Sequence, residues 1–559
     1  MAETAKRIFG IDLGTTYSSI AYVDEFGKAV MIPNAENERV TPSVVFFDED
    51  AVIVGEVAKE SAKLYPGDVV SFIKRSMGEP NFLFLHNGES IRAEEISAYI
   101  LRKLVKDAEH FLSEKVTDVV ITCPAYFGIN EREATRKAGE IAGLTVRQII
   151  NEPTAAAIAY DEFAKSDNGV VLVYDLGGGT FDITMIDIRK DSVEVICTGG
   201  DHHLGGKDWD DRISSYLVDV FQNETGTNED ILEDPDTLQD IILSVERAKK
   251  NLSQRQNTPI SITHAGERIK TLLGREKFEE LTADLLDRTI DFTHRMLEEA
   301  KEKGYPSFDE FILVGGATRM PMVQERIQKE FSIVPKVFDP DEAVAKGAAI
   351  FGWKLMLSNE FSGRLAEKIN KPINQLSNIS DLIKNKEICL QDVKDAKQQV
   401  SEATGCSFLK IETALMRVKN VTSKSFGIVA YNDNDQIIVF NLVLKNTGIP
   451  VVKKQKFYTT SDNQHSILIR IMESDTSQVE IPLGLAVDIR TATLSLPPLI
   501  PADSAIEVTF VLNEEGRLQI SAVETGEGHK IDILVDTASV IQDEDFEKAK
   551  SRSQCLVVH

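Results

Sequence analysis

The stretch Val173–Ile183, "VYDLGGGTFDI", ends an apolar run with an acidic residue and continues with three glycines. Because glycine has no Cβ, the backbone amides of such a turn can approach an oxyanion closely. The carboxylate of Asp175 would repel a phosphate bound there unless a cation lay between the two groups. Taken alone, the motif is equally typical of a tight hairpin turn that carries a solvated acid.

A second copy of this pattern lies near the N-terminus. Residues Ile8–Val23, "IFGIDLGTTYSSIAYV", also read as an apolar strand, Asp-Leu-Gly, a glycine and threonine turn, an aromatic residue and a second strand. Asp12 corresponds to Asp175. Two copies of one hairpin predict two lobes of similar build that face each other. A third glycine turn, Phe311–Pro321, follows another apolar strand and precedes a helical pattern.

The composition is that of a soluble globular protein with roughly three to four domains. The chain has 559 residues and a net charge of −27 without a basic stripe, which argues against a nucleic-acid partner. Its five cysteines are far apart and form no CxxC pair, which favours a reducing compartment. Neither a secretory signal nor a long apolar run is evident. We therefore expect a cytoplasmic protein without membrane association.

The pattern of apolar and polar residues changes three times along the chain. Residues 1–357 mix apolar strands with helical stretches such as Ile96–Leu112 and Leu238–Leu252, which predicts an α/β domain. Residues 358–423 are helical and polar, and we interpret them as an insertion with a linker. Residues 424–535 alternate apolar and polar positions around glycine turns, which predicts a small all-β sandwich. Residues 536–559 form a short, charged C-terminal tail.

Two facing hairpins with glycine amides could bind a polyphosphate from both sides. The carboxylates of Asp12 and Asp175 would then be hard oxygen ligands for Mg²⁺ or for its bound waters. That cation would screen the repulsion between acid and phosphate. The hydroxyls of Thr15, Thr16 and Thr180 can donate hydrogen bonds to phosphate oxygens. The repeated hairpin therefore predicts a nucleotide site between the two lobes.

Further motifs occur in a fixed order, and they resemble the 70-kDa heat-shock chaperone family. They are "NEPTAAAIAY" from Asn151, "HLGGKDWDDRI" from His203, "LVGGATRMP" from Leu313 and "DPDEAVAKGAA" from Asp339. The resemblance covers essentially all of residues 7–357. Actins and sugar kinases share only the first two hairpins, whereas "NEPTAAAIAY" and "HLGG.D" are specific to the chaperones. The resemblance implies a two-lobed, actin-like ATPase domain that holds ATP or ADP with Mg²⁺ in a central cleft.

The resemblance also implies roles for single residues. Asp12, Glu152 and Asp175 would organise Mg²⁺, largely through water, together with the attacking water. Lys74, in "SFIKRSMG", would neutralise charge on the transferring phosphoryl group. Without the resemblance, Lys74 reads as a solvated surface lysine. Thr180 would contact the γ-phosphate region. The other residues assigned to the nucleotide on this side are Gly14, Thr15, Thr16, Tyr17, Gly177, Gly178, Gly179, Gly205 and Gly206.

Four polar residues of "VERAKKNLS" fall at positions i, i+3, i+4 and i+7 and so share one helical face. Alone, this pattern is typical of an exposed charged face. The resemblance instead assigns Glu246 and Lys249 to the ribose, Ser253 to the adenine edge and Lys250 to one side of the adenine ring. Residues that would complete the site are Gly315, Gly316, Arg319 and Asp341.

Two positions depart from the family pattern around the base. Lys250 stands where arginine is usual, and a compact ammonium stacks on a base less well than a planar guanidinium. Ala317 replaces a usual serine and removes one hydrogen bond. We expect altered or weaker binding of adenine, and not its loss.

The segment 424–535 is similar, less closely, to the peptide-binding sandwich of the same family. The matching positions that would line an apolar groove are Ile428, Tyr431, Phe457, Ile467 and Ile469. Such a groove takes an extended segment by backbone hydrogen bonds and side-chain pockets. Without the resemblance, these residues read as ordinary strand core.

Two larger departures concern coupling between the domains. The linker, Leu415–Ile428, carries Arg417 and Lys419 where apolar residues are expected, and burying uncompensated charges costs several kcal/mol. These charges argue against coupling between the ATP site and the peptide site. The family's helical lid has almost no room after Val535, so we expect a divergent member without a lid that releases peptides quickly.

These observations predict an ATP-hydrolysing chaperone-like protein whose partners are unfolded, apolar polypeptides, a J-domain co-chaperone and a nucleotide-exchange factor. The first alternative is a weakly hydrolysing or non-hydrolysing relative that acts as a nucleotide-exchange partner or scaffold. A sugar kinase on the same fold is the second, but it would not explain the β-sandwich or the chaperone motifs.

Overall fold

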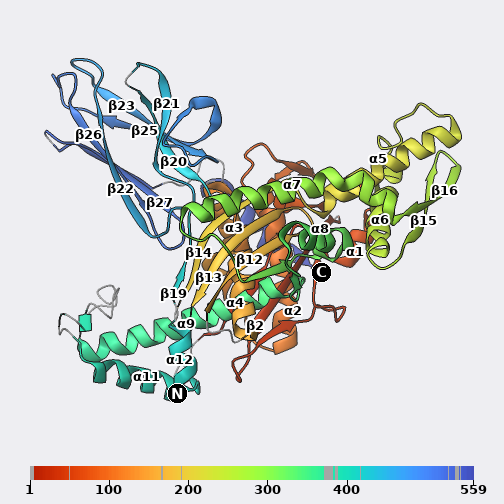
Figure 1. Cartoon of the computed structure of the whole chain (residues 1–559), viewed down its shortest axis with the longest axis horizontal. Coiled ribbons are helices and arrows are strands. Elements are labelled where there is room, and N and C mark those ends of the chain that lie inside the picture. The colour runs from red at the N-terminus through yellow and green to blue at the C-terminus, as the bar shows by residue number, and fades with distance from the viewer. Residues whose placement is uncertain are drawn as a thin grey trace.

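The computed structural model shows two lobes, a β-sandwich on one flank, a helical insertion below it and a projecting arm at the opposite end (Figure 1). The residues that the structure describes are 6–48, 51–164, 168–189, 192–370, 382–383, 385, 388–415, 417–432, 434–526, 528–534, 541 and 543–559.

Lobe I is built on a sheet with the strand order β11-β10-β1-β2-β3. The first strand, β1, runs parallel to β10 and antiparallel to β2, and β10 runs parallel to β11. The strands are β1 (Ile8–Asp12), β2 (Tyr17–Val23), β3 (Ala29–Ile32), β10 (Asp118–Cys123) and β11 (Thr145–Asn151), with β4 (Thr41–Pro42) paired to β2.

Lobe II repeats this arrangement in the order β18-β17-β12-β13-β14-β19. Here β12 is parallel to β17 and antiparallel to β13, as β1 is to β10 and β2. The strands are β12 (Asn168–Leu176), β13 (Phe181–Arg189), β14 (Ser192–Asp201), β17 (Glu310–Val314), β18 (Lys336–Val337) and β19 (Arg417–Lys419). The two-lobed α/β fold predicted from the repeated hairpin is confirmed.

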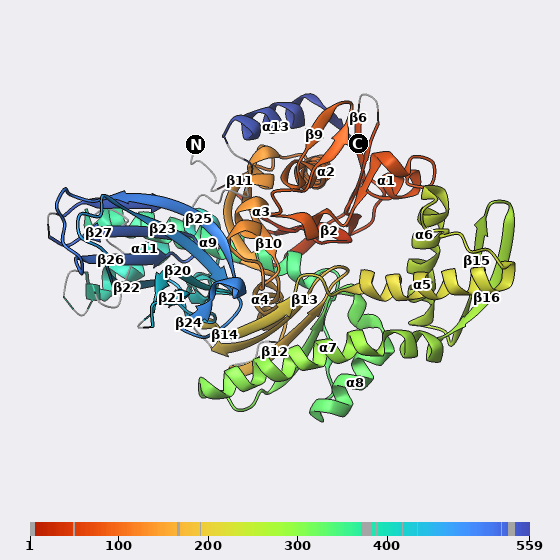
Figure 2. The ribbon, with the colours of Figure 1, turned by 90° about the horizontal axis from the view of Figure 1, so that it is seen from above.

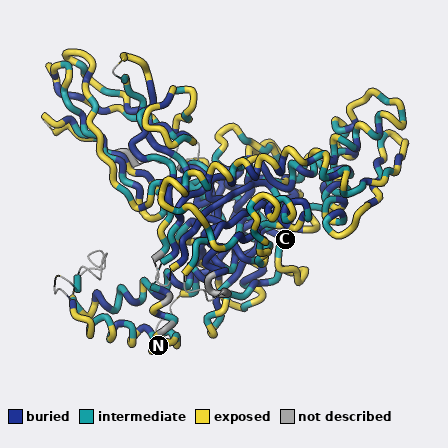
Figure 3. The backbone as a smooth tube through the Cα atoms, viewed as in Figure 1, coloured by how far each residue is buried: buried dark blue, intermediate teal, exposed yellow. Residues whose placement is uncertain are grey.

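Two helices, α4 (Glu152–Ala164) and α9 (Ala343–Ile369), fill the space between the sheets. Glycines allow their close packing: a Cβ on Gly347 of α9 would lie 1.8 Å from the backbone oxygen of Ala155 in α4. A Cβ on Gly10 of β1 would lie 2.1 Å from the backbone nitrogen of Ala349. Figure 3 shows that buried residues are concentrated at the centre of the molecule.

Other helices cover the outer faces of the two sheets. The helices α2 (Ala93–Leu112) and α3 (Ile129–Ile141) pack on lobe I, and α7 (Arg275–Glu302) and α8 (Pro321–Phe331) pack on lobe II. Lobe I also carries α1 (Glu56–Ser61), β5 (Val44–Phe47), β6 (Ala51–Val54), β7 (Val69–Ser71), β8 (Phe84–His86) and β9 (Glu89–Ile91). The projecting arm consists of α5 (Gly206–Thr225), α6 (Pro235–Leu252), β15 (Asn257–His264) and β16 (Glu267–Gly274).

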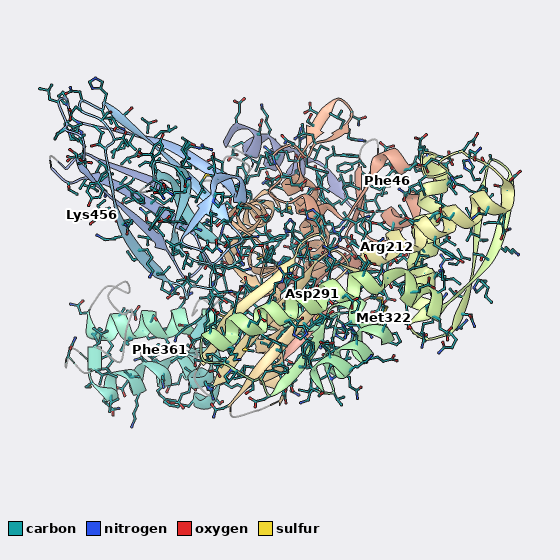
Figure 4. The ribbon with its side chains drawn as sticks, turned by 45° about the horizontal axis from the view of Figure 1, so that its top comes forward. Phe46, Arg212, Asp291, Met322, Phe361 and Lys456 are labelled. Atoms are coloured by element: carbon teal, nitrogen blue, oxygen red, sulfur yellow. The ribbon has the colours of Figure 1, made fainter. Side chains whose placement is uncertain are left out.

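The insertion predicted at 358–423 is a small helical bundle with its own core. Helix α9 runs through the predicted boundary at residue 357 and packs against α11 (Leu390–Thr404) and α12 (Phe408–Ala414). Phe361, labelled in Figure 4, lies in this core with Val400 and Ile411. Residues 371–381 of the predicted insertion lie outside the described residues.

The linker adds a strand to lobe II, which corrects the expectation that its charges oppose docking. Strand β19 pairs in parallel with β14, with Val418 opposite Val193 and Lys419 opposite Glu194. Side chains alternate along a strand, so Val418 packs on the core while Lys419 stays exposed. The Lys419 ammonium lies 3.1 Å from the Glu194 carboxylate. Docking therefore does not bury the charge of Lys419.

The predicted β-sandwich is confirmed as two sheets, with orders β24-β21-β20-β23-β25 and β22-β26-β27-β28. The first contains β20 (Ser425–Tyr431), β21 (Ile437–Val443), β23 (Ser466–Ser474), β24 (Glu480–Pro482) and β25 (Ala486–Ser495). The second contains β22 (Val451–Tyr458), β26 (Ala505–Leu512), β27 (Leu518–Glu524) and β28 (Lys530–Leu534). Residue 535, the predicted end of this domain, lies outside the described residues.

The predicted C-terminal tail, 536–559, contains folded structure. Residues Asp543–Cys555 form α13 and Val557–Val558 form β29, and both pack on lobe I. Residues 536–540 and 542 lie outside the described residues. Among the helices that are described, none has both the length and the apolar character needed to cross a membrane.

Candidate active site

The two repeated hairpins bring their turns together between the lobes. A Cβ on Gly178 would lie 1.7 Å from the Thr16 hydroxyl oxygen, and one on Gly179 would lie 2.4 Å from a side-chain carbon of Thr15. A side chain at either glycine would therefore collide with the opposite lobe. The N-terminus of α5 supports the lobe II turn from behind, because the Gly206 amide donates to the Gly177 oxygen at 2.9 Å.

Acidic side chains gather behind these turns. Asp175 follows the apolar part of β12, and Asp182 faces it across the hairpin in β13. Both are buried, and burial, reinforced by the nearby charge of Glu152, raises the pKa of each well above its ordinary value. Burial and Glu152 also raise the pKa of Asp12 to about 7. Such concentrated negative charge fits a bound divalent cation, for which carboxylate oxygens are suitable ligands.

Lys74 brings a positive charge to this cluster. It lies in a 3-10 turn, Ile73–Ser76, with 5% of its side chain exposed, and its ammonium donates to Glu152 at 2.5 Å. Burial lowers its pKa, but the charges of Glu152 and Asp12 outweigh burial and raise the pKa above its ordinary value. Lys74 is thus a buried, protonated lysine and not a solvated surface residue.

Residues that the sequence analysis did not select hold this cluster in place. The Thr122 hydroxyl donates to Asp12 at 3.0 Å, and the Tyr126 amide donates to Asp182 at 2.9 Å. Arg75 of lobe I donates to the Gly179 oxygen at 2.9 Å and pairs with Asp208 of α5 at 2.6 Å. Of these, Asp182 had a signal in the sequence, because it lies within the glycine hairpin itself.

A second polar cluster connects α6 with α1 of lobe I. Glu246 pairs with Lys59 of α1 at 2.6 Å and with Lys250 at 2.8 Å. Burial opposes ionisation, but these two lysines hold the pKa of Glu246 at about 2. The Lys250 ammonium also donates to the Tyr17 hydroxyl at 2.9 Å. Tyr17, Glu246 and Lys250 are therefore brought together as one group.

Further residues predicted to bind nucleotide form hydrogen bonds or ion pairs with residues outside this group of three. Lys249 donates to the Gly206 oxygen and to Asp210, both at 2.6 Å, and the Ser253 hydroxyl donates to the Lys249 oxygen at 3.2 Å. Arg319 pairs with Asp341 at 2.5 Å. Between these elements, Gly315 has a φ of 84°, a conformation that glycine adopts readily and other residues do not. Three further predicted glycines lie in turns next to other predicted nucleotide residues: Gly14 before Thr15, Gly205 before Gly206 and Gly316 after Gly315.

The predicted groove residues are distributed over the sandwich. Ile428 and Ile469 are buried in the sandwich core, Phe457 and Ile467 are half-buried against it, and Tyr431 is exposed. The first two therefore fit the strand-core alternative as well as a groove floor.

A family model described as Hsp70 protein matches residues 8–83, 80–361 and 390–556. The chain belongs to the Hsp70 family. A curated relative, "Stromal 70 kDa heat shock-related protein, chloroplastic" from Pisum sativum, is 34% identical over 581 residues, covering 98% of this chain and 73% of the relative. The resemblance stated from the sequence motifs is confirmed. Members of the Hsp70 family are ATPases and chaperones that bind nucleotide with Mg²⁺.

The same comparison corrects the predicted location. The composition pointed to a cytoplasmic protein, but the Pisum sativum Hsp70 is named as a chloroplastic stromal protein. Sparse, unpaired cysteines indicate only a reducing environment and do not distinguish one such compartment from another. The expectation of a cytoplasmic location is therefore wrong.

Proposed function

We propose that this Hsp70 binds ATP with Mg²⁺ between its lobes, hydrolyses it to ADP and phosphate, and engages apolar polypeptide segments through its β-sandwich. The observation that carries the hydrolytic part is Lys74, buried against Glu152 beside the acids Asp12 and Asp175. Perturbed, buried ionisable groups in contact with each other are characteristic of functional sites.

The proposed chemistry assigns a role to each side chain. Asp12 and Asp175 would hold the magnesium ion, largely through water. Bound magnesium would neutralise charge on the phosphates and polarise them. Glu152 keeps Lys74 protonated and fixed, so the ammonium can stabilise charge on the transferring phosphoryl group without reorganisation. The Thr180 hydroxyl and the glycine amides would bind the terminal phosphate, and water would attack it in line.

The adenosine would lie farther out along α6. Glu246 pairs with Lys59 from lobe I and with Lys250 from its own helix. The position of Glu246, and so the shape of the proposed adenosine site, therefore depends on how closely lobe I approaches α6. Lys250 already bonds to Tyr17 and Glu246, and a compact ammonium stacks poorly on a base. These features support the proposal of altered adenine binding.

Polypeptide engagement is supported by the sandwich and its apolar surface. Tyr431, Leu468 and Val487 expose 60%, 59% and 66% of their surface. Single exposed apolar residues are common, but several on one small domain suit an extended apolar ligand. Family membership supports clients that are unfolded segments and partners that include J-domain co-chaperones and nucleotide-exchange factors.

The non-hydrolysing alternative is not favoured. Lys74, Glu152 and Asp175 are present and buried, and Asp12, which is half-buried, lies beside them. The charged linker had supported that alternative, but the linker is docked as β19.

The test is single-turnover ATP hydrolysis by the wild-type chain and the Lys74→Ala variant. We expect the variant to lose about 10²–10³-fold in rate, the typical cost of removing one charge-stabilising group. Lys115→Ala is the control, because this lysine is 83% exposed and pairs with Glu109 on the surface. Equal rates in wild type and Lys74→Ala, with nucleotide binding retained in both, would contradict the hydrolytic role.

A further inference from the structure

Three successive residues at the end of β14 carry side chains that can bind a metal ion. Asp201 ends the strand, and His202 and His203 lie in the turn that follows it. Their ligand atoms, one carboxylate oxygen and one ring nitrogen from each histidine, all lie within 4.8 Å of one another. Two imidazoles and one carboxylate are a common set of ligands for divalent transition metals.

Both imidazoles can still accept a metal ion. Among the described residues, none forms a hydrogen bond with a ring nitrogen of His202 or His203. His202 is half-buried, and its ring stacks on Tyr126 of lobe I with the ring centres 6.1 Å apart. His203 is exposed, and its ring centre lies 4.2 Å from that of His202. An ion can therefore reach the cluster from solvent.

The carboxylate of Asp201 is held in one orientation by its neighbours. One of its oxygens accepts from the His203 amide at 2.8 Å, and the other pairs with Arg288 of α7 at 2.7 Å. Each carboxylate oxygen has two lone pairs, so these contacts leave room for a metal ion. Carboxylates that bind metals are commonly oriented by additional hydrogen bonds of this kind.

The spacing of the donor atoms is close to what a single ion requires. Zinc lies about 2.0–2.1 Å from a histidine nitrogen, so two donors on one tetrahedral zinc ion are about 3.3 Å apart. The observed spacing reaches a somewhat larger value, but the exposed His203 can rotate about its side-chain bonds toward the other two donors. Binding therefore requires side-chain movement and can leave the backbone of the turn in place.

The ligands also select the class of ion. Imidazole nitrogen suits Zn²⁺, Ni²⁺ and Cu²⁺, whereas Mg²⁺ and Ca²⁺ prefer sites made of oxygen atoms. Arg288 places a positive charge beside the carboxylate, which disfavours an ion held by charge alone. The cluster therefore differs in chemistry from the oxygen site that Asp12 and Asp175 would provide for magnesium.

The turn that carries this cluster is joined to the glycine turn of lobe II. Helix α5 begins three residues after His203 and runs from the lobe II sheet into the projecting arm (Figure 2). At its start, the Gly206 amide donates to the Gly177 oxygen at 2.9 Å, and the Lys207 amide donates to the Gly178 oxygen at 2.8 Å. An ion that fixes the turn before α5 would therefore restrain these two supports.

We propose that Asp201, His202 and His203 bind a divalent transition-metal ion, and that the bound ion holds the turn between β14 and α5 in one conformation. The ion stabilises the contacts of α5 with the glycine turn and takes no part in hydrolysis. This site goes beyond the proposed ATPase activity, because none of its three ligands is assigned to the nucleotide or to magnesium.

The test is a titration of Zn²⁺ into the full chain without nucleotide, against a coloured chelator as competitor. His202→Ala and His203→Ala should each lower the affinity of the tightest site at least about tenfold, because even a supporting residue of a metal site is worth about 10–100-fold. Asp201→Asn keeps the shape of the side chain and should weaken binding by a similar factor. A roughly hundredfold excess of Mg²⁺ should not displace the zinc.

His110→Ala is the matched control, because this histidine is exposed on α2 and belongs to no such cluster among the described residues. It should bind zinc as the wild type does. Hydrogen exchange of the Gly206 and Lys207 amides reports the effect on the turn. Zinc should slow both amides at least about threefold in the wild type and in His110→Ala, and should leave them unchanged in His202→Ala.

Two results would overturn the proposal. Equal zinc affinity in the wild type, His202→Ala and His203→Ala would show that these histidines do not bind the ion. Exchange of the Gly206 amide that does not respond to zinc in the wild type would show that the ion does not hold the turn. Both measurements are made without nucleotide, so their outcome is separate from that of the proposed function.

Discussion

At the scale of single residues, the contact between lobe I and the sandwich buries ionisable side chains. Glu473 of β23 accepts from the Ile129 amide, and Lys424 lies 3.6 Å from the Tyr126 ring centre. Burial, reinforced by the charge of Glu131, raises the pKa of Glu473 to about 7. Burial lowers the pKa of Lys424 to about 8.

These pKa values predict that docking weakens as the pH rises toward neutrality. Between the ordinary pKa of a glutamate and about pH 7, docked Glu473 keeps its proton and undocked Glu473 has lost it. Because the docked form binds the extra proton, lower pH favours docking in this range. Lys424 opposes this effect only above about pH 8. Exchange of the Ile129 amide, corrected for the intrinsic rate, should rise about tenfold more from pH 5.5 to 7.5 in the wild type than in Glu473→Gln. Parallel curves for the two proteins would contradict this prediction.

The sequence predicted some site residues and not others for a physical reason. Asp12 and Asp175 stand out because each follows a strand and precedes a glycine turn, a pattern that is local. Glu131 and Glu473 have no such pattern, and they meet only because the sandwich docks beside α3. Lys74 required the family resemblance, since a lysine in a short turn carries no local sign of burial.

At the scale of elements, the crossing of α9 and α4 depends on one glycine. A Cβ on Gly347 would lie 1.8 Å from the backbone oxygen of Ala155, and both residues are buried. We expect Gly347→Ala to lower the free energy of unfolding by about 3 kcal/mol, the cost of forcing packed helices apart. Gly363→Ala in the same helix is the control, because nothing lies within 4 Å of its Cβ.

That control should gain about 0.5–1 kcal/mol, since alanine is the better helix former. Urea unfolding followed by circular dichroism measures both variants. A Gly347→Ala protein as stable as Gly363→Ala would show that the helices are not packed this closely.

The elements also show where pattern reading failed. From the sequence, Arg417 and Lys419 in place of apolar residues predict a linker that docks poorly. In β19 these positions alternate with Val418, so the strand packs Val418 against the core and leaves Lys419 beside Glu194. Strand formation depended on the partner β14, which lies more than two hundred residues earlier (residues 192–201) and which the linker sequence does not reveal.

At the scale of the whole molecule, two copies of one sheet enclose the site, and the sandwich is attached to both. The repeat was readable from the sequence because each copy keeps its hairpin motif. The fold of 543–559 was not readable. Its helix has few apolar residues, and its strand has two residues, so both depend on lobe I for their burial.

The most direct test of the central claim is calorimetric titration of ATP into the purified chain with Mg²⁺ and again with the metal chelated. If Asp12 and Asp175 hold a cation that bridges them to the phosphates, ATP should bind with Mg²⁺ and lose at least tenfold in affinity without it. In Asp175→Asn the two affinities should move closer together. Failure to bind ATP in the presence of Mg²⁺, or equal affinity in both conditions, would contradict a magnesium nucleotide site between the two hairpins.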